Sequence, residues 1–161
     1  MIVSNATPLI NFGKQGVLNI LKKCFDKIII PNAVYNEIIM KRDNPEVIAL
    51  MKAIEEKWIM IENIGINPIL ATKNLGEGEK EAISLAVKYK SILLIDDDSA
   101  KSYANIFGVE THGSIYIIYL ACIKRHLQKE EARKILDSMI KEGFYVSTEV
   151  YSRFLELLEN I

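Results

Sequence analysis

Three consecutive acidic residues, Asp96, Asp97 and Asp98, follow a short apolar run, and this junction is the part of the sequence best suited to chemistry. The run Ser91–Ile95 has the length of a buried strand, and ligands of α/β sheets gather just beyond the carboxyl ends of such strands. Like charges this close are costly unless a cation uses them, and Mg²⁺ and Mn²⁺ prefer oxygen ligands. The triplet therefore predicts a divalent metal site, with a helix cap at Asp98 or Ser99 as the structural alternative.

Other oxygen-bearing side chains occur where one edge of a sheet can collect them. Asn5 follows the expected first strand, and Glu37 lies in a helix that opens just after the second strand. The helix before the aspartates opens with three glutamates, Glu77, Glu79 and Glu81. At about 100° per residue, Glu77 and Glu81 share a helix face that Glu79 does not, but this periodicity does not decide which glutamate points inward. In a parallel sheet, the ends of the first and fourth strands lie on one rim, so a cluster of oxygen ligands is available.

Strand and helix patterns alternate along most of the chain. Strands are expected at 2–4, 27–30, 58–61 and 92–95, and helices from residue 7 and at 17–24, 31–40, 44–57, 78–89 and 99–107. Residues 63–74 read as a loop. From residue 114 the chain turns helical, with helices at 115–125, 129–141 and 148–158 and a short extended piece at 144–146. This order predicts an α/β fold with a mostly parallel sheet and a helical C-terminal part.

The composition sets broader limits on the class of protein. A chain of 161 residues with 50% hydrophobic and 25% charged residues predicts one globular domain spanning 1–161. The formal net charge of −1 provides no global attraction to nucleic acid. No long apolar run suggests a membrane span, and the N-terminal sequence lacks signal-peptide features, so a cytoplasmic location is expected. Cys24 and Cys122 are expected to be buried free thiols.

Five short motifs, taken in order, resemble the PIN-domain family, in particular a prokaryotic subfamily of VapC-like and predicted nucleases. The motifs are V-S-N-A-T-P-L-I, I-I-I-P-N-A-V-Y-N-E-I, L-G-E-G-E-K-E-A-I-S-L-A, L-L-I-D-D-D-S-A and T-H-G-S-I-Y-I-I-Y-L-A. The resemblance runs from Met1 to about Arg125, and the tail G-F-Y-V-S-T-E-V-Y is similar to the ending of the same subfamily. It implies a Rossmann-like three-layer α/β/α sandwich whose carboxylates bind Mg²⁺ or Mn²⁺ and hydrolyse phosphodiester bonds of RNA.

The resemblance also implies which residues form the site. Its first acidic position falls on Asn5, its second on Glu37 and its third on Glu81, with Glu79 as the alternate. The fourth falls on Asp97, with Asp96 beside it, and Thr7 matches the small hydroxyl residue that follows the first position. Single-stranded or looped RNA is the expected substrate, because a shallow acidic rim needs an accessible backbone. A homodimer and a small antitoxin protein are the implied protein partners.

Asn5 departs from the general family pattern, which has Asp at this position. An amide carbonyl can ligate Mg²⁺ but adds no negative charge and cannot act as a base, so metal affinity should fall. The chief alternative is therefore a catalytically weak or inactive PIN-like module that binds RNA or protein.

Four residues outside the acidic set are expected to be structural. His112 and His126 are too few and too far apart in the sequence for a histidine-based site, and they are interpreted as structural or surface residues. Tyr116 and Tyr119 lie three apart on an apolar helix, a spacing that favours core packing or a helix contact over base stacking.

Overall fold

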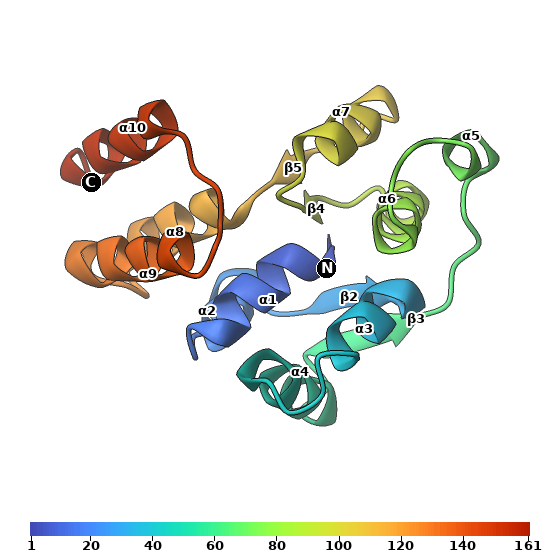
Figure 1. The fold of residues 1–161 in the computed structure, drawn as a ribbon, viewed down its shortest axis with the longest axis horizontal. Coiled ribbons are helices and arrows are strands. Elements are labelled where there is room, and N and C mark those ends of the chain that lie inside the picture. Colours follow the sequence, from blue (N-terminus) through green and yellow to red (C-terminus); the bar gives the residue numbers. More distant parts are fainter.

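A five-stranded sheet in which every neighbouring pair is parallel forms the centre of the computed structural model, which describes residues 1–161. Its strands lie in the order β3-β2-β1-β4-β5 (Figure 1). Their bounds are Ile2–Ser4 (β1), Ile28–Pro31 (β2), Ile59–Glu62 (β3), Leu93–Leu94 (β4) and Thr111–His112 (β5). The expected parallel sheet is confirmed, and β1 lies at its centre between β2 and β4.

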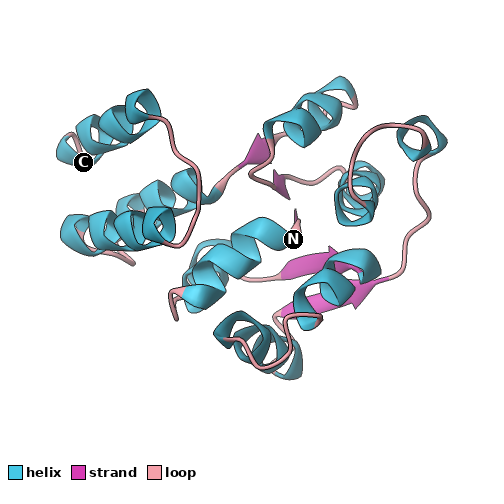
Figure 2. Ribbon diagram, viewed as in Figure 1, coloured by secondary structure: helices cyan, strands magenta, loops and turns pink.

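The chain forms ten helices, of which those at the C-terminus lie to one side of the sheet (Figure 2). Their bounds are Ala6–Lys14 (α1), Asn19–Phe25 (α2), Asn32–Ile39 (α3), Pro45–Glu55 (α4), Pro68–Ala71 (α5), Glu77–Tyr89 (α6), Asp98–Ile106 (α7), Ser114–Ile123 (α8), Lys129–Lys141 (α9) and Thr148–Glu159 (α10). The Rossmann-like three-layer α/β/α fold is therefore confirmed, together with its helical C-terminal part.

Two short elements differ from the sequence prediction. Helix α5 lies inside the segment expected to be a loop, where Pro68 opens it and the Asn67 side chain accepts a hydrogen bond from the Ile69 N–H at 3.0 Å. Strand β5 was not expected, because its two residues, Thr and His, form no apolar run. The expected extended piece at 144–146 belongs to no strand.

The central strands bring the ends of β1 and β4 together. Val3 pairs with Ile29 of β2 on one side and with Leu93 of β4 on the other. These residues are buried, as expected for strands covered on both faces. The Asn5 N–H donates a hydrogen bond of 2.8 Å to the Leu94 carbonyl, so the chain leaves β1 and β4 at neighbouring positions. The shared rim expected from the sequence therefore exists.

The C-terminal helices pack beside α1 and α2, away from the part of the molecule that holds α5 and α6 (Figure 1). Ser147 caps α10 by accepting a hydrogen bond from the Val150 N–H at 3.2 Å. The buried apolar side chains form one continuous cluster, which includes Val3 in the sheet and Phe154 in α10. None of the helices is long and apolar enough to cross a membrane.

Both cysteines are free and buried, as expected. Burial raises the pKa of the Cys24 thiol and of the Cys122 thiol. Both groups are therefore poor nucleophiles at neutral pH.

Gly13 allows α1 and α4 to pack closely. A Cβ atom at this position would lie 2.8 Å from both the Cα and the Cβ of Glu46, which is closer than packed atoms allow. We therefore expect Gly13→Ala to push the two helices apart. Overpacking costs about 1–3 kcal/mol, and the better helix propensity of Ala returns only about 1 kcal/mol, so thermal denaturation should show a lower Tm.

Gly65→Ala is the matched control for Gly13→Ala, because nothing lies within 4 Å of the Cβ that it would add. Its Tm should stay close to that of the wild type. A Tm for Gly13→Ala at or above the wild-type value would contradict the close contact between the helices.

Candidate active site

Asn5 places an amide oxygen at the end of β1. Its backbone is held to β4 by the bond to Leu94, and the residue is only 4% exposed. The side-chain Oδ1 is buried and has no hydrogen-bond partner in the protein. A buried polar atom without a partner costs roughly 1–3 kcal/mol, so this oxygen is suited to a ligand that would satisfy it.

The Glu37 carboxylate of α3 lies near the Asn5 amide oxygen, beside Gly78. A Cβ atom added to Gly78 of α6 would lie 3.0 Å from Glu37 Oε2, 3.4 Å from Val34 Cγ2 and 3.6 Å from Asn5 Oδ1. The carboxylate oxygen and the amide oxygen therefore face one small volume beside α6. Gly78 keeps that volume open because it has no side chain, and this role was missed in the sequence, where the only sign was the G-E-G-E spacing.

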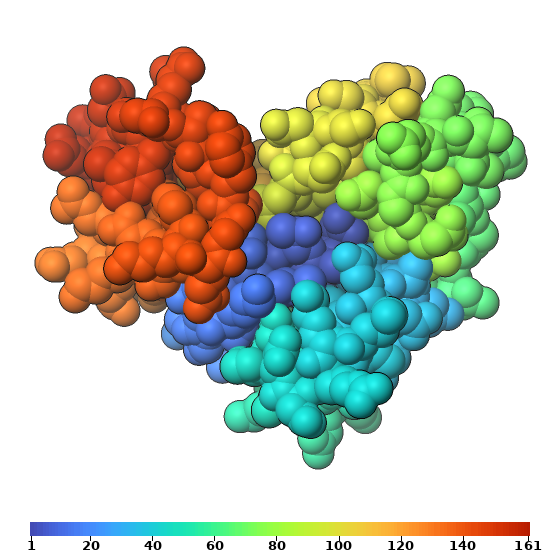
Figure 3. All heavy atoms as spheres, in the orientation of Figure 1, coloured from blue at the N-terminus to red at the C-terminus, as the bar shows by residue number.

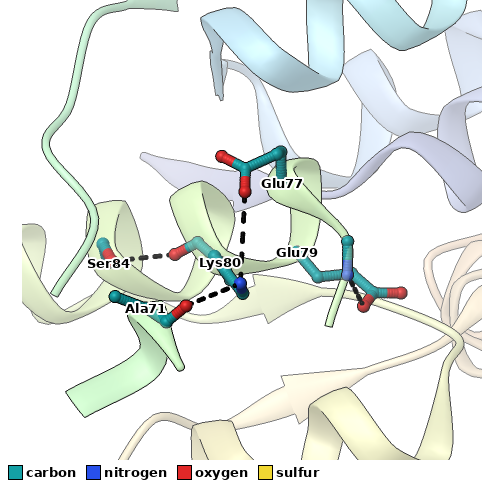
Figure 4. A network of polar contacts seen from close by, with 6 residues as sticks. Ala71, Glu77, Glu79, Lys80 and Ser84 are labelled. Carbon is teal, nitrogen blue, oxygen red and sulfur yellow. Dashed lines mark hydrogen bonds and ion pairs between the residues drawn. The ribbon is translucent and has the colours of Figure 1, made fainter. Parts of the chain in front are cut away.

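Glu79 and Glu81 cap the starts of two different helices. Glu79 Oε2 accepts a hydrogen bond from the Gly76 N–H at 3.0 Å and so caps its own helix, as Figure 4 shows. Glu81 Oε2 accepts one from the Ala33 N–H at 2.8 Å and so caps α3. Each carboxylate keeps its second oxygen free of protein partners. Both glutamates remain available as ligands.

The electrostatic environment of Glu79 connects it to other acidic residues. Burial raises the pKa of Glu79, the bond from Gly76 lowers it in part, and the charges of Asp97 and Glu37 raise it further. Asp97 and Glu37 therefore lie close enough to repel the Glu79 carboxylate. A cation bound among the three would relieve that repulsion.

Lys80 and Ser84 form hydrogen bonds that link the start of α6 to the preceding segment. Lys80 Nζ donates to the Ala71 carbonyl at 3.0 Å, and its ammonium lies 4.0 Å from Glu77 (Figure 4). Ser84 Oγ donates to the Lys80 carbonyl at 2.8 Å and accepts from the Asn67 N–H at 2.9 Å. These contacts hold the helix that carries Glu79 and Glu81 in place.

The three aspartates have different positions. Asp97 caps α7 by accepting from the Ala100 N–H at 2.8 Å, whereas Asp98 is exposed in the first turn of that helix. Both oxygens of Asp96 accept hydrogen bonds of 2.7 Å from Ser114, one from its N–H and one from its hydroxyl. Burial raises the pKa of Asp96, and these two bonds offset part of that effect. Asp96 thus anchors the start of α8 to the end of β4.

Glutamates of α3 and α6 line an open pocket of about 570 Å³. Its polar lining includes Asn5, Thr7, Asn32, Asn36, Glu37, Glu77, Glu79 and Glu81, and we call it the acidic pocket. Asp96 and Asp97 do not line it. Asn32 and Asn36 were not among the site residues predicted from the sequence.

The donor set of the acidic pocket fits a hard divalent cation. All candidate ligands are carboxylate or amide oxygens, and the orphaned Asn5 Oδ1 faces the Glu37 carboxylate. No group of three or more acidic, histidine or cysteine side chains is arranged so that it could hold a metal ion by itself. Mg²⁺ usually keeps several waters and binds one or two carboxylates, so a complete cage is not required.

Fold and site together define a class of α/β protein whose polar side chains gather at the carboxyl ends of β1 and β4. Comparisons with known proteins identify the family. A family model described as PIN domain matches residues 1–160. The chain therefore belongs to the PIN-domain family, which generally has a metal-dependent nuclease fold. No curated protein matches the sequence.

A solved structure agrees at the level of the fold. The chain is similar to SSO1118, a PilT N-terminus domain protein from the archaeon Sulfolobus solfataricus P2, with 16% identity and a TM-score of 0.51. This match covers 91% of our chain and 100% of the other. A domain of a functionally unknown protein from Methanocaldococcus jannaschii DSM 2661 is 27% identical, with a TM-score of 0.48, over 70% of our chain and 89% of that one.

Gly78→Ala should lower the metal affinity of the acidic pocket without lowering the stability of the fold. The added methyl group would crowd the movable Glu37 carboxylate, whereas Ala is favoured over Gly inside a helix by about 1 kcal/mol. We expect an unchanged or higher Tm together with a fall in metal affinity of about 10-fold or more, as for other changes that misplace a ligand. Titration with Mn²⁺, followed by the rise in Tm, measures the affinity.

Gly65→Ala is also the control for Gly78→Ala, because nothing lies within 4 Å of its added Cβ and Gly65 does not line the acidic pocket. Equal Mn²⁺ affinity in the wild type and Gly78→Ala would mean that the ion does not bind between Asn5 and Glu37.

Proposed function

We propose that this protein is a Mg²⁺- or Mn²⁺-dependent endoribonuclease that hydrolyses phosphodiester bonds in single-stranded or looped RNA. The observation that carries the proposal is the buried, unpartnered Asn5 Oδ1, which faces Glu37 Oε2 beside Gly78. The raised pKa of Glu79, to which Asp97 and Glu37 contribute, adds support for a cation site. Membership of the PIN-domain family supports the class of reaction.

The residues receive the following roles in this proposal. Asp97, Glu37 and Glu81 hold the cation directly or through water, with Glu79 as the alternate to Glu81 and Asn5 contributing its amide oxygen. A bound divalent ion supplies hydroxide near neutral pH and neutralises charge on the phosphate oxygens. Thr7, which lines the acidic pocket, donates a hydrogen bond from its hydroxyl to the substrate phosphate. Asp96 positions α8 beside Asp97, and each of its oxygens keeps a lone pair with which it could join the ligand set.

A second candidate function is a PIN-like module that binds RNA or protein and catalyses weakly or not at all. It is favoured by the neutral side chain at Asn5 and by the absence of a complete cage of three acidic side chains. The two functions differ in whether a cation bound at Asn5 and Glu37 supports turnover.

We also propose a cellular location and protein partners for this activity. We place the activity in the cytoplasm, where RNA substrates are found, with a homodimer and a small antitoxin protein as partners implied by the VapC-like resemblance. The exposed apolar side chain of Ile123 on α8, at 49%, favours the dimer.

Cleavage of a fluorescence-quenched single-stranded RNA tests the proposed function. Purified protein should cleave it with Mn²⁺ or Mg²⁺, and EDTA should abolish the signal. No cleavage with either ion would favour the binding module, provided that Asn5→Asp also fails to restore activity.

Asn5→Asp gives a readout that does not depend on turnover. It places a second charge beside the Glu37 carboxylate in a buried position, so Tm in EDTA should fall below that of the wild type. Mn²⁺ should then raise its Tm by more than it raises the wild-type value. Equal responses to Mn²⁺ would argue against a cation at this position.

A further inference from the structure

A second pocket shares no lining residue with the acidic pocket. It has a volume of about 500 Å³ and is lined by Asp96, Asp98 and Lys101, by the start of α8, and by the segment that joins α9 to α10. Figure 3 shows a hollow between the yellow residues around α7 and the orange and red C-terminal helices. We call it the aromatic pocket because His112, Tyr116, Phe144 and Tyr145 contribute to its wall.

Two of these rings form a stack that reaches the surface. The His112 and Tyr116 rings lie 3.7 Å apart between centroids and only 13° from parallel. Tyr116 is 38% exposed, so of the two expected roles, core packing and a helix contact, the structure does not support full burial in the core. Tyr145, which also lines the pocket, is 86% exposed. Exposed aromatic faces of this kind are platforms on which unpaired bases stack.

The charges in the aromatic pocket favour a base over a phosphate. Asp96 and Asp98 line it, and their negative charges disfavour a phosphate group inside it. Asp98 is exposed, so its carboxylate can accept a hydrogen bond from an amino group on a base edge. Lys101 also lines the pocket and makes no ion pair within 4.0 Å, but its ammonium lies near Asp96, because a Cβ atom on Gly113 would lie 2.7 Å from Asp96 Oδ1 and 3.3 Å from Lys101 Nζ.

We propose that the aromatic pocket binds one unstacked base of single-stranded RNA, against the His112–Tyr116 stack, next to the cleavage site. Asp97, which the proposed function assigns to the cation, is directly flanked in sequence by Asp96 and Asp98, which line the aromatic pocket. A base held there leads the adjoining phosphate towards Asp97. This inference rests on the proposed function, because the acidic pocket defines where the phosphate is cut.

Binding of a fluorescein-labelled single-stranded hexanucleotide RNA, followed by anisotropy, tests the base site. The measurement uses Asp97→Asn protein with Mg²⁺, so that the RNA stays intact. Adding Tyr116→Ala should weaken binding by about 5- to 100-fold, the range of base-stacking contacts, while Tyr116→Phe keeps the affinity within about twofold. Tyr89→Ala is the matched control, because Tyr89 is also 38% exposed but lies at the far end of α6.

An RNA with one abasic residue, moved along the hexanucleotide, identifies the contact. At one position the missing base should weaken binding to protein with Tyr116 but have no further effect on Tyr116→Ala. If Tyr116→Ala lowers Tm, Tyr145→Ala replaces it, because that exposed side chain contributes little to folding. Full RNA affinity in Tyr116→Ala and Tyr145→Ala, or indifference to every abasic position, would overturn the base site and leave the pocket to a protein ligand.

The two proposals fail in different ways. RNA binding that depends on Tyr116, in a wild-type protein that cleaves no RNA, would overturn the nuclease and keep the base site. Suppose instead that Asp97→Asn abolishes cleavage, whereas Tyr116→Ala changes neither KM nor kcat. That result would overturn the base site and keep the nuclease.

Discussion

Asp97→Asn should lower metal-dependent RNA cleavage by at least about 100-fold while Tm stays within about 2 °C of the wild type. A cation stabilises the charge of a phosphoryl transition state by several kcal/mol, and each 1.4 kcal/mol corresponds to about tenfold in rate. Asn removes the negative charge but still caps α7, because its carbonyl can accept the Ala100 N–H bond that Asp97 Oδ1 now accepts. Initial rates with saturating Mn²⁺ give the effect on catalysis, and thermal denaturation gives the effect on the fold.

Asp43→Asn is the control, since it also removes one carboxylate from an exposed position, in the turn between α3 and α4. It should leave the rate unchanged. Equal cleavage by the wild type and Asp97→Asn would falsify the assignment and indicate a contaminating nuclease. A large fall in Tm would instead mean that Asp97 acts mainly through the helix cap.

Phe154→Ala should cost about 3–5 kcal/mol of unfolding free energy, which is the usual cost of removing a buried aromatic ring. Phe154 is 2% exposed in α10 and belongs to the cluster that also contains the residues of the sheet. For a chain of this length, the loss corresponds to a Tm lower by roughly 6–20 °C. We further expect one cooperative transition, because we propose that residues 1–161 form a single domain.

Leu157→Ala is the matched control on the same helix, because Leu157 is 41% exposed. It should change the free energy of unfolding by no more than about 0.5 kcal/mol, as is usual for surface positions. Calorimetry and far-ultraviolet circular dichroism should agree on the transition temperature. Two separated transitions in Phe154→Ala, with only one of them shifted, would show that the C-terminal helices fold as a separate unit.

The order of strands and helices could be predicted because it depends on local patterns. Ile28, Ile29 and Ile30 form a buried strand, and Pro45 marks the start of α4 in the structure as in the sequence. The weak elements were missed because their signals are short. Strand β5 has two residues, and α5 has four, within a segment rich in loop-forming residues.

The acidic residues could be selected from the sequence, but their individual geometry could not. Residues 81 and 79 both lie at the opening of α6, yet one carboxylate caps α3 and the other caps its own helix. Asp96 and Asp97 are adjacent, yet the first binds Ser114 and the second caps α7. The partners Gly76 and Ala100 are local, whereas Ala33 and Ser114 lie 48 and 18 residues away from their carboxylates, at distances that helix and strand periodicity does not report.

By itself, therefore, the sequence determined the parallel α/β architecture, the expected family and the rim at which oxygen atoms collect. Hydrophobic periodicity and strand order are sufficient for these features, because they depend on which residues are buried. Only the tertiary structure decided that Gly78 opens a space between Asn5 and Glu37, and that Tyr116 is exposed beside His112. These features arise from the packing of elements far apart in the chain, where a contact of about 3 Å depends on the positions of several helices at once.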